Sequence, residues 1–267
     1  MGEMKMLFEV AENERIPDDI IRSMFYDDGA YSVMQFKNLY NCLAAHDYWT
    51  AYPPSLLVDI RAQVRDSLAK NNRDTKFWAS EYCILEKNDE ITMPSSPVKS
   101  INLGLYVARL IHTNLAVANA SAWQWWTAVS LNEDVPLWLQ PMEGSSGETV
   151  KYDGRVVTTK MFWATANYSF FVRPGMRRVD VRAVDKEVSP LEAATSLMVS
   201  SYTDGTQVVT VFVNYADADK SIALKCDNAR KGKMYVTSID KDLQYVGKQR
   251  LDALSIPARS VVTVVVD

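Results

Sequence analysis

The chain has 267 residues, of which 48% are hydrophobic and 23% charged, and its formal net charge is −4. This composition is ordinary for a folded globular protein and excludes a disordered chain. The sequence contains no Lys/Arg-rich run, so we expect no nucleic-acid partner. No apolar run approaches the ~18 residues of a membrane span, so we expect no membrane partner. The one excess is aromatic, with 7 Trp and 13 Tyr, some of them clustered.

The N-terminal segment lacks the apolar core of a signal peptide, because four glutamates fall within its first 15 residues. As written, the chain is expected to stay in the cytoplasm. Three cysteines, Cys42, Cys83 and Cys226, are too few and too scattered for a disulfide scaffold or a zinc site. We expect them to be reduced, partly buried thiols.

Residues 1–174 alternate short apolar runs with amphipathic stretches. The helix expected over residues 53–70 begins with two prolines and carries Leu57, Ile60, Val64 and Leu68 as one apolar stripe. Strands that alternate with helices predict βα units and a parallel sheet. The expected strands are residues 5–10, 41–46, 76–81 and 119–125, and the expected helices are residues 17–25, 53–70, 97–117 and 159–171.

In residues 176–267 the spacing of the apolar residues changes from that of alternating strands and helices to that of strands alone. Valine-rich runs such as VVTVFVNY and SVVTVVV favour strands, and Asp204-Gly205 between two of the runs is a hairpin turn signal. This part is expected to be all-β, a small antiparallel sandwich. We therefore expect a βα domain over residues 1–174 and a sandwich domain over residues 175–267. The expected strands are residues 176–183, 194–202, 207–215, 221–226, 233–239 and 259–266.

The first part does not close into a barrel by itself. It holds four strand–helix units, whereas a (β/α)8 barrel usually needs ~250 residues. Four parallel units could also form an open sheet. No glycine-rich phosphate loop follows any expected strand, so a nucleotide site has no support and no cofactor is expected.

The segment FWASEYC places Glu81 at the end of an expected strand. In a barrel, catalytic groups project from this end of the strands. Alternation along the strand puts Ala79 and Glu81 on one face, where the small Ala79 would leave room below the carboxylate. The alternative is a strand-end glutamate that pairs with a surface cation.

His46 and Tyr48 lie two residues apart in AAHDYW, at the end of the preceding strand. This spacing puts both side chains on the same side of the strand. They would lie beside Glu81 and could orient its carboxylate. The alternative is a histidine at the barrel rim whose hydrogen bonds are satisfied and which has no catalytic role. A metal site needs more ligands, and His112, the only other histidine, falls in an expected helix, so no metal is expected.

The segment NASAWQWWTAVS places three tryptophans within four residues at the next strand end. Asn119, Ser121, Trp123 and Trp125 would share a face. Aromatic faces at a pocket rim suit flat, C–H-rich ligands, of which sugars are the common case. The alternative is a set of core aromatics under the helix layer.

Four segments, HDYWTAYP, FWASEYC, ANASAWQWWTAVS and ANYSFFVRPGMRRV, together resemble glycoside hydrolase family 30. The resemblance is to its bacterial branch near endo-β-1,6-galactanases and related exo-acting enzymes, and it extends over roughly residues 40–267. It implies a (β/α)8 barrel fused to a β-sandwich, a retaining mechanism, and a β-linked carbohydrate substrate such as β-1,6-galactan.

In that family the nucleophile is a glutamate at the end of strand seven, within a W-x-S-E pattern. The resemblance assigns this role to Glu81, in Trp78-Ala79-Ser80-Glu81. The strands that end at His46 and Trp125 would then be strands six and eight. The resemblance further implies these substrate-binding residues: His46, Tyr48, Tyr82, Trp123, Gln124 and Trp125.

The family's acid/base, a glutamate in Asn-Glu-Pro at the end of strand four, has no counterpart in this sequence. Asn13-Glu14 follows the first expected strand, which would be strand five, and Asn132-Glu133 follows strand eight. A retaining glycosidase needs two carboxyl groups. The expected fold is therefore the C-terminal part of a TIM barrel, about strands five to eight, followed by an antiparallel β-sandwich.

Two functions remain open. One is a glycosidase fragment without its acid/base half, either a truncated reading frame or a chain completed by a complementary N-terminal chain, whose parent enzyme would be secreted or periplasmic. The other is a non-catalytic carbohydrate-binding remnant. The constellation of Glu81, His46, Tyr48 and Trp125 favours the first. Expressed alone, the chain is expected to have no glycosidase activity, because the nucleophile cannot protonate the leaving oxygen.

Overall fold

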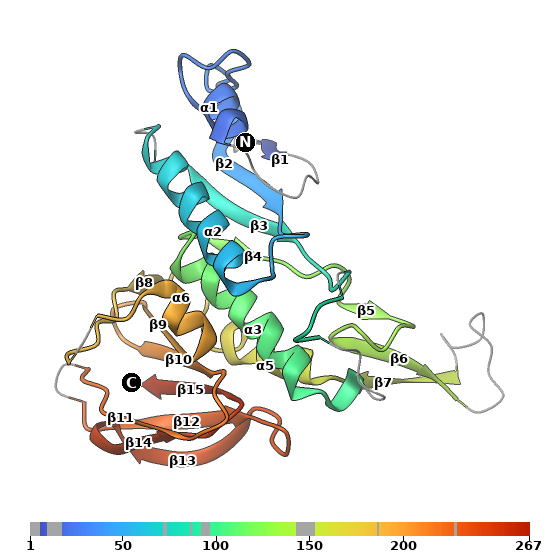
Figure 1. Cartoon of the computed structure of the whole chain (residues 1–267), viewed down its shortest axis with the longest axis vertical. Helices are drawn as coiled ribbons and strands as arrows, with labels where there is room; N and C mark the ends of the chain where they lie inside the picture. Colours follow the sequence, from blue (N-terminus) through green and yellow to red (C-terminus); the bar gives the residue numbers. More distant parts are fainter. Residues whose placement is uncertain are drawn as a thin grey trace. The chain divides into compact units, whose positions relative to one another are not determined.

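The computed structural model describes residues 6–9, 18–71, 74–85, 87–91, 97–142, 153–185, 187–226 and 229–267. It forms two compact units, of which the first comprises Met1–Glu86 and Thr113–Trp126 and the second Lys87–His112 and Thr127–Asp267. Figure 1 shows the elements in chain order. The domain boundary expected between residues 174 and 175 stays a prediction.

The first unit contains a four-stranded parallel sheet with the strand order β1-β2-β3-β4. This order, with helices between consecutive strands, confirms the predicted βα units and corresponds to part of a TIM barrel. The strands are β1 (Met6–Glu9), β2 (Leu39–His46), β3 (Lys76–Glu81) and β4 (Ala122–Trp123). The last strand is shorter than the expected residues 119–125, because the backbone at Asn119 has a φ of 58° and is not extended.

Two helices connect the first three strands: α1 (Asp18–Phe25) and α2 (Pro54–Ala69). The second begins with proline in its first turn, as the sequence predicts, since the missing proline N–H has no partner to lose at that position. Its apolar stripe is confirmed, because all four of its predicted side chains are buried: Leu57, Ile60, Val64 and Leu68.

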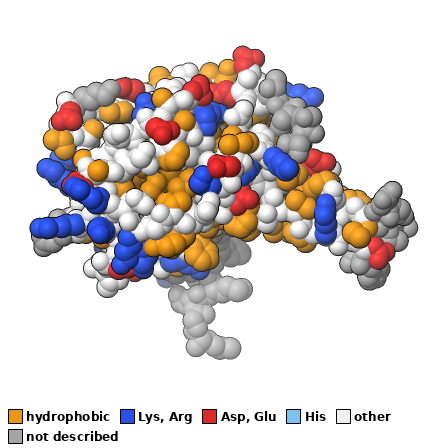
Figure 2. All heavy atoms as spheres, turned by 90° about the horizontal axis from the view of Figure 1, so that it is seen from below, with side chains coloured by type: hydrophobic (Ala, Val, Ile, Leu, Met, Phe, Trp, Pro, Cys, Tyr) orange, Lys and Arg blue, Asp and Glu red, His pale blue; other side chains and the backbone are white. Residues whose placement is uncertain are grey.

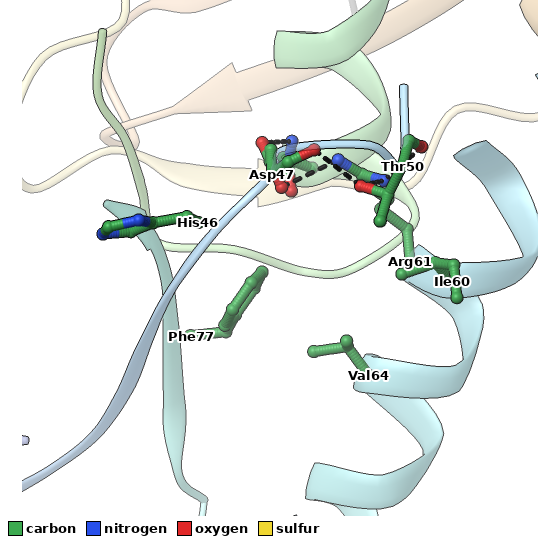
Figure 3. A pocket seen from close by; sticks show the side chains of 8 residues that line it. His46, Asp47, Thr50, Ile60, Arg61, Val64 and Phe77 are labelled. Atoms are coloured by element: carbon green, nitrogen blue, oxygen red, sulfur yellow. Dashed lines mark hydrogen bonds and ion pairs between the residues drawn. The ribbon is translucent and has the colours of Figure 1, made fainter. Parts of the chain in front are cut away.

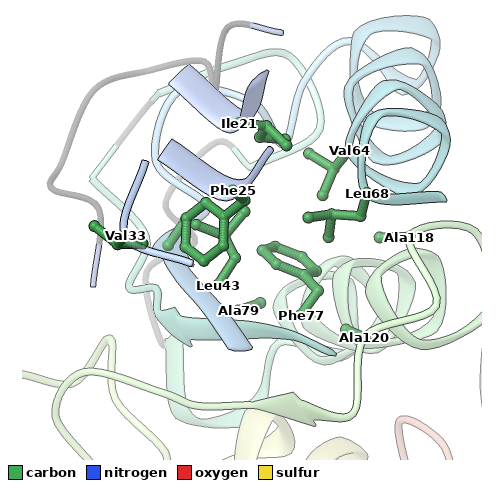
Figure 4. Close-up of a cluster of buried hydrophobic side chains, with 11 residues drawn as sticks. Ile21, Phe25, Val33, Leu43, Val64, Leu68, Phe77, Ala79, Ala118 and Ala120 are labelled. Atoms are coloured by element: carbon green, nitrogen blue, oxygen red, sulfur yellow. The ribbon is translucent and has the colours of Figure 1, made fainter. Parts of the chain in front are cut away.

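A hydrophobic cluster lies between the sheet and these two helices (Figure 4). Phe77 of β3 and Leu43 of β2 meet Val64 and Leu68 of α2 there, together with Phe25 of α1. Completely buried aliphatic and aromatic side chains each stabilise a fold by roughly 1.5–3 kcal/mol relative to exposure. This cluster therefore holds β2 and β3 in register, with their carboxyl ends side by side.

A β-bulge near the end of β3 changes which face Glu81 occupies. Ala45 pairs with Ala79, but the next residue of β2, His46, pairs with Glu81, so Ser80 is the extra residue. Consecutive residues of β2 face opposite sides, and their partners Ala79 and Glu81 must do the same. The expectation that Ala79 lies below the carboxylate is therefore wrong: Ala79 belongs to the buried cluster under the helices.

Helix α3 (Ile101–Ala116) follows the short 3-10 helix η1 (Pro97–Lys99), as predicted for residues 97–117. It is buried around most of its circumference, and the buried residues include the charged Arg109. The Arg109 guanidinium is paired with Glu90 and stacks over the rings of Tyr106 and Tyr215. A buried guanidinium needs such partners, because an unpaired charge in an apolar interior is very costly.

The second unit includes a small three-stranded sheet that the sequence patterns did not predict. Its strands are β5 (Val129–Ser130), β6 (Leu137–Pro141) and β7 (Gly154–Thr158). Each is short and contains no fully buried residue, and none carries the longer apolar run that is typical of a buried strand. Helix α5 (Lys160–Ser169) follows, and the Thr159 hydroxyl caps it by accepting from the Phe162 N–H at 3.3 Å.

The main sheet of the second unit has six strands and is antiparallel, which confirms the predicted all-β portion. The strand order is β13-β12-β15-β10-β9-β8, and a separate ladder joins β11 (Lys220–Ile222) to β14 (Leu254–Ile256). The six strands are β8 (Arg177–Val179), β9 (Leu197–Thr203), β10 (Val208–Asn214), β12 (Lys231–Thr237), β13 (Gln244–Arg250) and β15 (Ser260–Val266).

The two central strands β10 and β15 are buried almost throughout, which explains their continuous valine runs. One face forms a core cluster with Phe212, Met234 and Leu251. The other face packs against α5, where the Asn167 amide donates to the Thr237 hydroxyl at 2.6 Å and the Thr263 hydroxyl donates to the Asn167 carbonyl at 2.7 Å. The interspersed threonines thus provide polar partners beneath a helix.

Turn chemistry explains where the prediction succeeded and failed in this unit. The Asp204 side chain accepts from the N–H groups of Thr206 and Gln207, and Gly205 has a φ of 92°, so the predicted hairpin between β9 and β10 is confirmed. Residues 194 and 195, expected as the start of the strand over residues 194–202, instead end helix α6 (Pro190–Thr195), which the Ser189 hydroxyl caps by accepting from the Glu192 N–H.

The surface shows no single dominant feature on the face drawn in Figure 2, where apolar side chains lie between charges of both signs. Among the residues that the structure describes, no helix is both long enough and apolar enough to cross a membrane.

One testable consequence concerns His112, which lies within α3 and is 6% exposed. Burial, aided by the charge of Arg178, lowers the pKa of this imidazole from 6.5 to about 4. Below pH 6.5 the unfolded chain therefore binds a proton that the folded chain rejects, and stability falls as the pH drops towards 4. The loss is expected to reach roughly 3 kcal/mol.

Chemical denaturation of the wild type and His112→Gln between pH 4 and 7.5 measures this. The free energy of unfolding of the wild type should fall more steeply with decreasing pH than that of the variant. Equal slopes would show that His112 does not titrate differently in the two states.

Candidate active site

Three strands of the parallel sheet end at the same edge and bring polar and aromatic side chains together. His46 is the last residue of β2 and pairs with Glu81, the last residue of β3, while Ala79 pairs with Trp123 of β4. In parallel βα folds, functional groups gather at the carboxyl ends of the strands. The Glu81 side chain is 22% exposed, so its carboxylate is accessible but largely enclosed.

The Glu81 carboxylate has two neighbours from the end of β2, as the sequence predicts. The Tyr48 hydroxyl donates to Glu81 Oε1 at 2.8 Å, and His46 Nδ1 lies 3.7 Å from the same oxygen. The two rings meet edge to face, with centroids 5.8 Å apart. Both contacts fall on Oε1.

Tyr48 acts as a permanent donor to this carboxylate. Burial, followed by the adjacent Cys83 and Glu81, raises the pKa of the phenol well above its usual value, so the hydroxyl stays protonated. The Cys83 sulfur lies 3.6 Å from the same hydroxyl, a contact that no local sequence pattern predicts.

A series of aromatic rings extends from Tyr48 to β4. Tyr48 stacks on Tyr82 with centroids 5.8 Å apart, Tyr82 meets the edge of Trp125 at 5.9 Å, and Trp125 contacts Trp123 at 6.1 Å. Tyr82 is completely buried, whereas the two tryptophans are half-buried and present part of their rings to solvent. The predicted association of these aromatic residues in space is thus observed, with Tyr82 packed among them.

Backbone hydrogen bonds fix the end of β4 against β3. The N–H of Gln124 donates to the Ala79 carbonyl at 2.9 Å, and the N–H of Trp126 donates to the Tyr82 carbonyl at 2.9 Å. The Gln124 side chain is exposed, as is the ring of Trp126. The substrate-binding roles expected from the resemblance remain predictions for all of these residues.

A buried ion pair that the sequence analysis missed lies directly behind the site. Asp47 is 4% exposed, and its Oδ1 lies 2.7 Å from Arg61 Nη2, itself 2% exposed (Figure 3). The Asn114 amide and the Trp123 indole N–H donate to Asp47 Oδ2 at 2.6 and 3.2 Å. Burial raises the pKa of this carboxyl, and the three donors oppose that shift by favouring the charged form.

Arg61 was detectable in principle, since it shares the buried face of α2 with Leu57, Val64 and Leu68 at helical spacing. An arginine within an apolar stripe indicates a buried partner, because a lone guanidinium is too costly to bury. Its partner Asp47 has no such signal, because it lies in the loop between His46 and Tyr48, where no helical or strand spacing predicts burial.

The cavity enclosed by this network is small. It is lined by residues that include His46, Asp47, Arg61 and Asn114, and its volume is ≈ 10 Å³. That is room for a single water molecule and far too little for a sugar ring.

In the part of the chain that the structure describes, no group of three or more His, Cys, Asp or Glu side chains is placed to hold a metal ion. Cys42 is buried, and Cys83 and Cys226 are half-buried. Burial raises the pKa of the Cys42 thiol to about 11. Of the two Asn-Glu pairs noted in the sequence, the one with Glu14 lies outside the described residues, and Glu133 lies in the second unit between β5 and β6.

The sequence model described as O-glycosyl hydrolase family 30 matches residues 2–134. A crystal structure of a conserved exported protein from Bacteroides fragilis is 65% identical and superposes with a TM-score of 0.90, over 93% of this chain and 50% of that one. This chain thus spans half the length of that relative. No curated protein sequence matches significantly.

Two more distant structures share the fold. A family 30 endoxylanase from Clostridium papyrosolvens is 18% identical with a TM-score of 0.66, covering 96% of this chain and 55% of that enzyme. A family 30 subfamily 8 xylanase from Clostridium acetobutylicum is 19% identical with a TM-score of 0.60, covering 97% and 55%. Residues 2–134 thus belong to glycoside hydrolase family 30, and the fold of the chain is a partial barrel followed by a β-sandwich. The galactanase branch suggested by the resemblance is not specified by these matches.

The Tyr48–Glu81 hydrogen bond is testable by stability. Replacing Tyr48 by Phe removes a donor from a largely enclosed carboxylate, which is expected to lower the free energy of unfolding by about 1–2 kcal/mol. The matched control is Tyr31→Phe, because the Tyr31 side chain is 75% exposed and its hydroxyl can be replaced by water. Equal stabilities of the two variants in urea denaturation would mean that the Tyr48–Glu81 contact contributes nothing.

Proposed function

We propose that this chain carries the nucleophile half of a retaining β-glycosidase site and that Glu81 is the nucleophile. The single observation that supports this most is the placement of Glu81: a partly exposed carboxylate at a strand end, held by the Tyr48 hydroxyl at 2.8 Å. A carboxylate fixed through one oxygen presents the other in a defined direction, as nucleophilic attack requires.

In the proposed reaction, Glu81 Oε2 attacks the anomeric carbon of the sugar while the bond from that carbon to the leaving oxygen breaks. The leaving oxygen takes a proton from a general acid, and the sugar remains as an ester on Glu81. Water, deprotonated by the same acid/base group, then attacks the anomeric carbon and releases the sugar with its original configuration. Tyr48 keeps its proton throughout, and its hydroxyl stabilises the Glu81 carboxylate whenever that carboxylate is not bonded to the sugar.

The acid/base carboxyl is expected to come from elsewhere. Retaining enzymes place the two carboxyl groups ~5–5.5 Å apart. Asp47, although nearby in sequence, does not suit this role, because Arg61, Asn114 and Trp123 all donate to it. We infer that a complementary N-terminal segment or chain supplies the acid, consistent with a relative that is twice as long.

The proposed substrate class is a β-linked polysaccharide or oligosaccharide. The half-buried rings of Trp123 and Trp125 and the exposed ring of Trp126 offer apolar faces to sugar rings beside Glu81. β-1,6-Galactan, suggested by the sequence resemblance, and xylan are the two candidate polymers to compare. A secreted or periplasmic parent enzyme is proposed, because the 65% identical relative is described as exported.

A second candidate is a carbohydrate-binding remnant without catalysis. The observation in its favour is the exposure of tryptophan rings near the site, with Trp49 48% and Trp126 56% exposed, since binding needs aromatic faces but no nucleophile. Trapping of the covalent intermediate separates the two candidates.

The test uses 2-deoxy-2-fluoro-β-glycosides of xylose, galactose and glucose with a 2,4-dinitrophenyl leaving group. This leaving group departs without protonation, so the absence of an acid/base does not prevent formation of the ester. Peptide mass spectrometry is expected to find one glycosyl group per chain, on the peptide that contains Glu81. Unactivated aryl glycosides and β-1,6-galactan should not be turned over by the chain alone, because missing acid catalysis costs ~10²–10⁴-fold.

Glu81→Gln is the matched variant, since it preserves size and hydrogen bonding but removes the nucleophilic charge. It is expected to abolish labelling while retaining the wild-type unfolding curve. Labelling of another residue, or equal labelling of Glu81→Gln, would contradict the assignment. Saturable sugar binding with no covalent adduct would favour the binding remnant.

A further inference from the structure

Asp47 is a buried carboxylate that the proposed chemistry does not use directly. It lies in the chain between His46 and Tyr48, the two residues that approach Glu81. Its own carboxylate accepts from donors on three other segments: Arg61 of α2, Asn114 near the end of α3, and Trp123 of β4. One side chain therefore ties the loop after β2 to three other parts of the first unit.

The same ion pair also holds the loop after β2 in its conformation, through contacts with Thr50. Arg61 Nη1 donates to the Thr50 carbonyl at 2.8 Å and to its hydroxyl at 2.7 Å, and that hydroxyl donates to the Asp47 carbonyl at 2.7 Å. Trp49, inside the loop, has a φ of 60°, a conformation that bulky residues rarely adopt. A strained backbone persists only where surrounding contacts enforce it, and the Asp47–Arg61 pair provides those contacts.

Asp47 reaches the site along two routes. Its backbone N–H donates to the Glu81 carbonyl at 3.1 Å, which fixes the separation between the Tyr48 ring and the end of β3. Its Oδ2 holds the indole N–H of Trp123, whose ring contacts Trp125. One residue thus sets both positions: its backbone N–H sets the position of the Tyr48 donor, in a loop that its carboxylate holds through Arg61, and its carboxylate sets the Trp123 ring.

We propose that Asp47, paired with Arg61, is the positioning residue of the Glu81 site: its carboxylate fixes the Tyr48 donor against Glu81 and fixes the Trp123 ring that receives the sugar. This inference rests on the proposed function in assigning roles to Glu81 and Trp123. The geometric part, that Asp47 controls both contacts, is separate and can be tested without any sugar.

Asp47→Asn is the informative change. It preserves size but leaves only one acceptor oxygen for three donors, and the Arg61 guanidinium loses its counter-charge in a buried place. The loop should relax so that Arg61 reaches solvent, which moves Tyr48 away from Glu81 and releases the Trp123 indole. The matched control is Asp28→Asn, which removes an exposed aspartate that pairs with Arg22 at 2.8 Å in the same unit.

Two readouts need no sugar. The first is the rate at which a water-soluble carbodiimide and glycinamide amidate Glu81, followed by peptide mass spectrometry. The second is hydrogen exchange of the Trp123 indole N–H in ¹⁵N-tryptophan-labelled protein, with the signal assigned through Trp123→Phe. Asp47→Asn is expected to change the Glu81 rate about fivefold, in the same direction as Tyr48→Phe, and to accelerate indole exchange about tenfold. Asp28→Asn should match the wild type in both.

Arg61→Lys is the second variant and keeps the proposal testable if Asp47→Asn does not fold. Lysine retains the charge but cannot reach Asp47 and Thr50 with a planar fork, so both readouts should change in the same direction by less. A merely structural role predicts lower stability with unchanged Glu81 amidation and unchanged indole exchange relative to other carboxylates and indoles. That result in either variant overturns the proposal.

The 2-fluoroglycoside reaction links the positioning role to chemistry. If the wild type is labelled, Asp47→Asn should lower the limiting rate of labelling by up to about 10²-fold, as expected when a nucleophile is displaced by about 1 Å. An unchanged limiting rate would contradict a positioning role in catalysis. If the wild type is not labelled, the proposed function fails, while amidation and indole exchange still decide whether Asp47 controls the geometry.

Discussion

The buried ion pair between Asp47 and Arg61 is the interaction on which the candidate site depends. Both groups lie out of water, so each must be fully partnered, and the partners come from β4, the end of α3 and the loop itself. Such a pair adds little net stability over apolar side chains of the same volume. Its value is geometric, because a charge that requires several donors in fixed places specifies one arrangement of the segments that supply them.

A second constraint comes from the parallel sheet. The cluster around Phe77 and Leu43 aligns β2 and β3, and the bulge at Ser80 then turns Glu81 to the face of His46 rather than to that of Ala79. Without the extra residue, regular alternation would direct this carboxylate towards the helices. The sheet therefore brings the strand ends together, the bulge selects the face, and the ion pair sets the final positions of Tyr48 and Trp123.

Predictability from sequence followed the strength of the local signals. The strand Lys76–Glu81 and the helix Pro54–Ala69 were expected almost to the residue, because the aromatic pair Phe77-Trp78 marks the strand and an N-terminal proline marks the helix. The strand Gln244–Arg250 was missed, since an exposed edge strand has no apolar run. Glu81, His46 and Tyr48 were placed together correctly, but the bulge and the Asp47 network depend on contacts between distant segments, which no local pattern encodes.

The central claim is that Glu81 forms a covalent glycosyl ester, and the most direct measurement is the configuration of the first product. This chain would be fused to the part of the Bacteroides fragilis protein that it does not cover, and the fusion supplied with xylan and β-1,6-galactan oligosaccharides. Proton NMR of the first anomeric signals should then show the β-anomer, with no product from Glu81→Gln. The α-anomer as first product would indicate inversion and would contradict a nucleophilic Glu81.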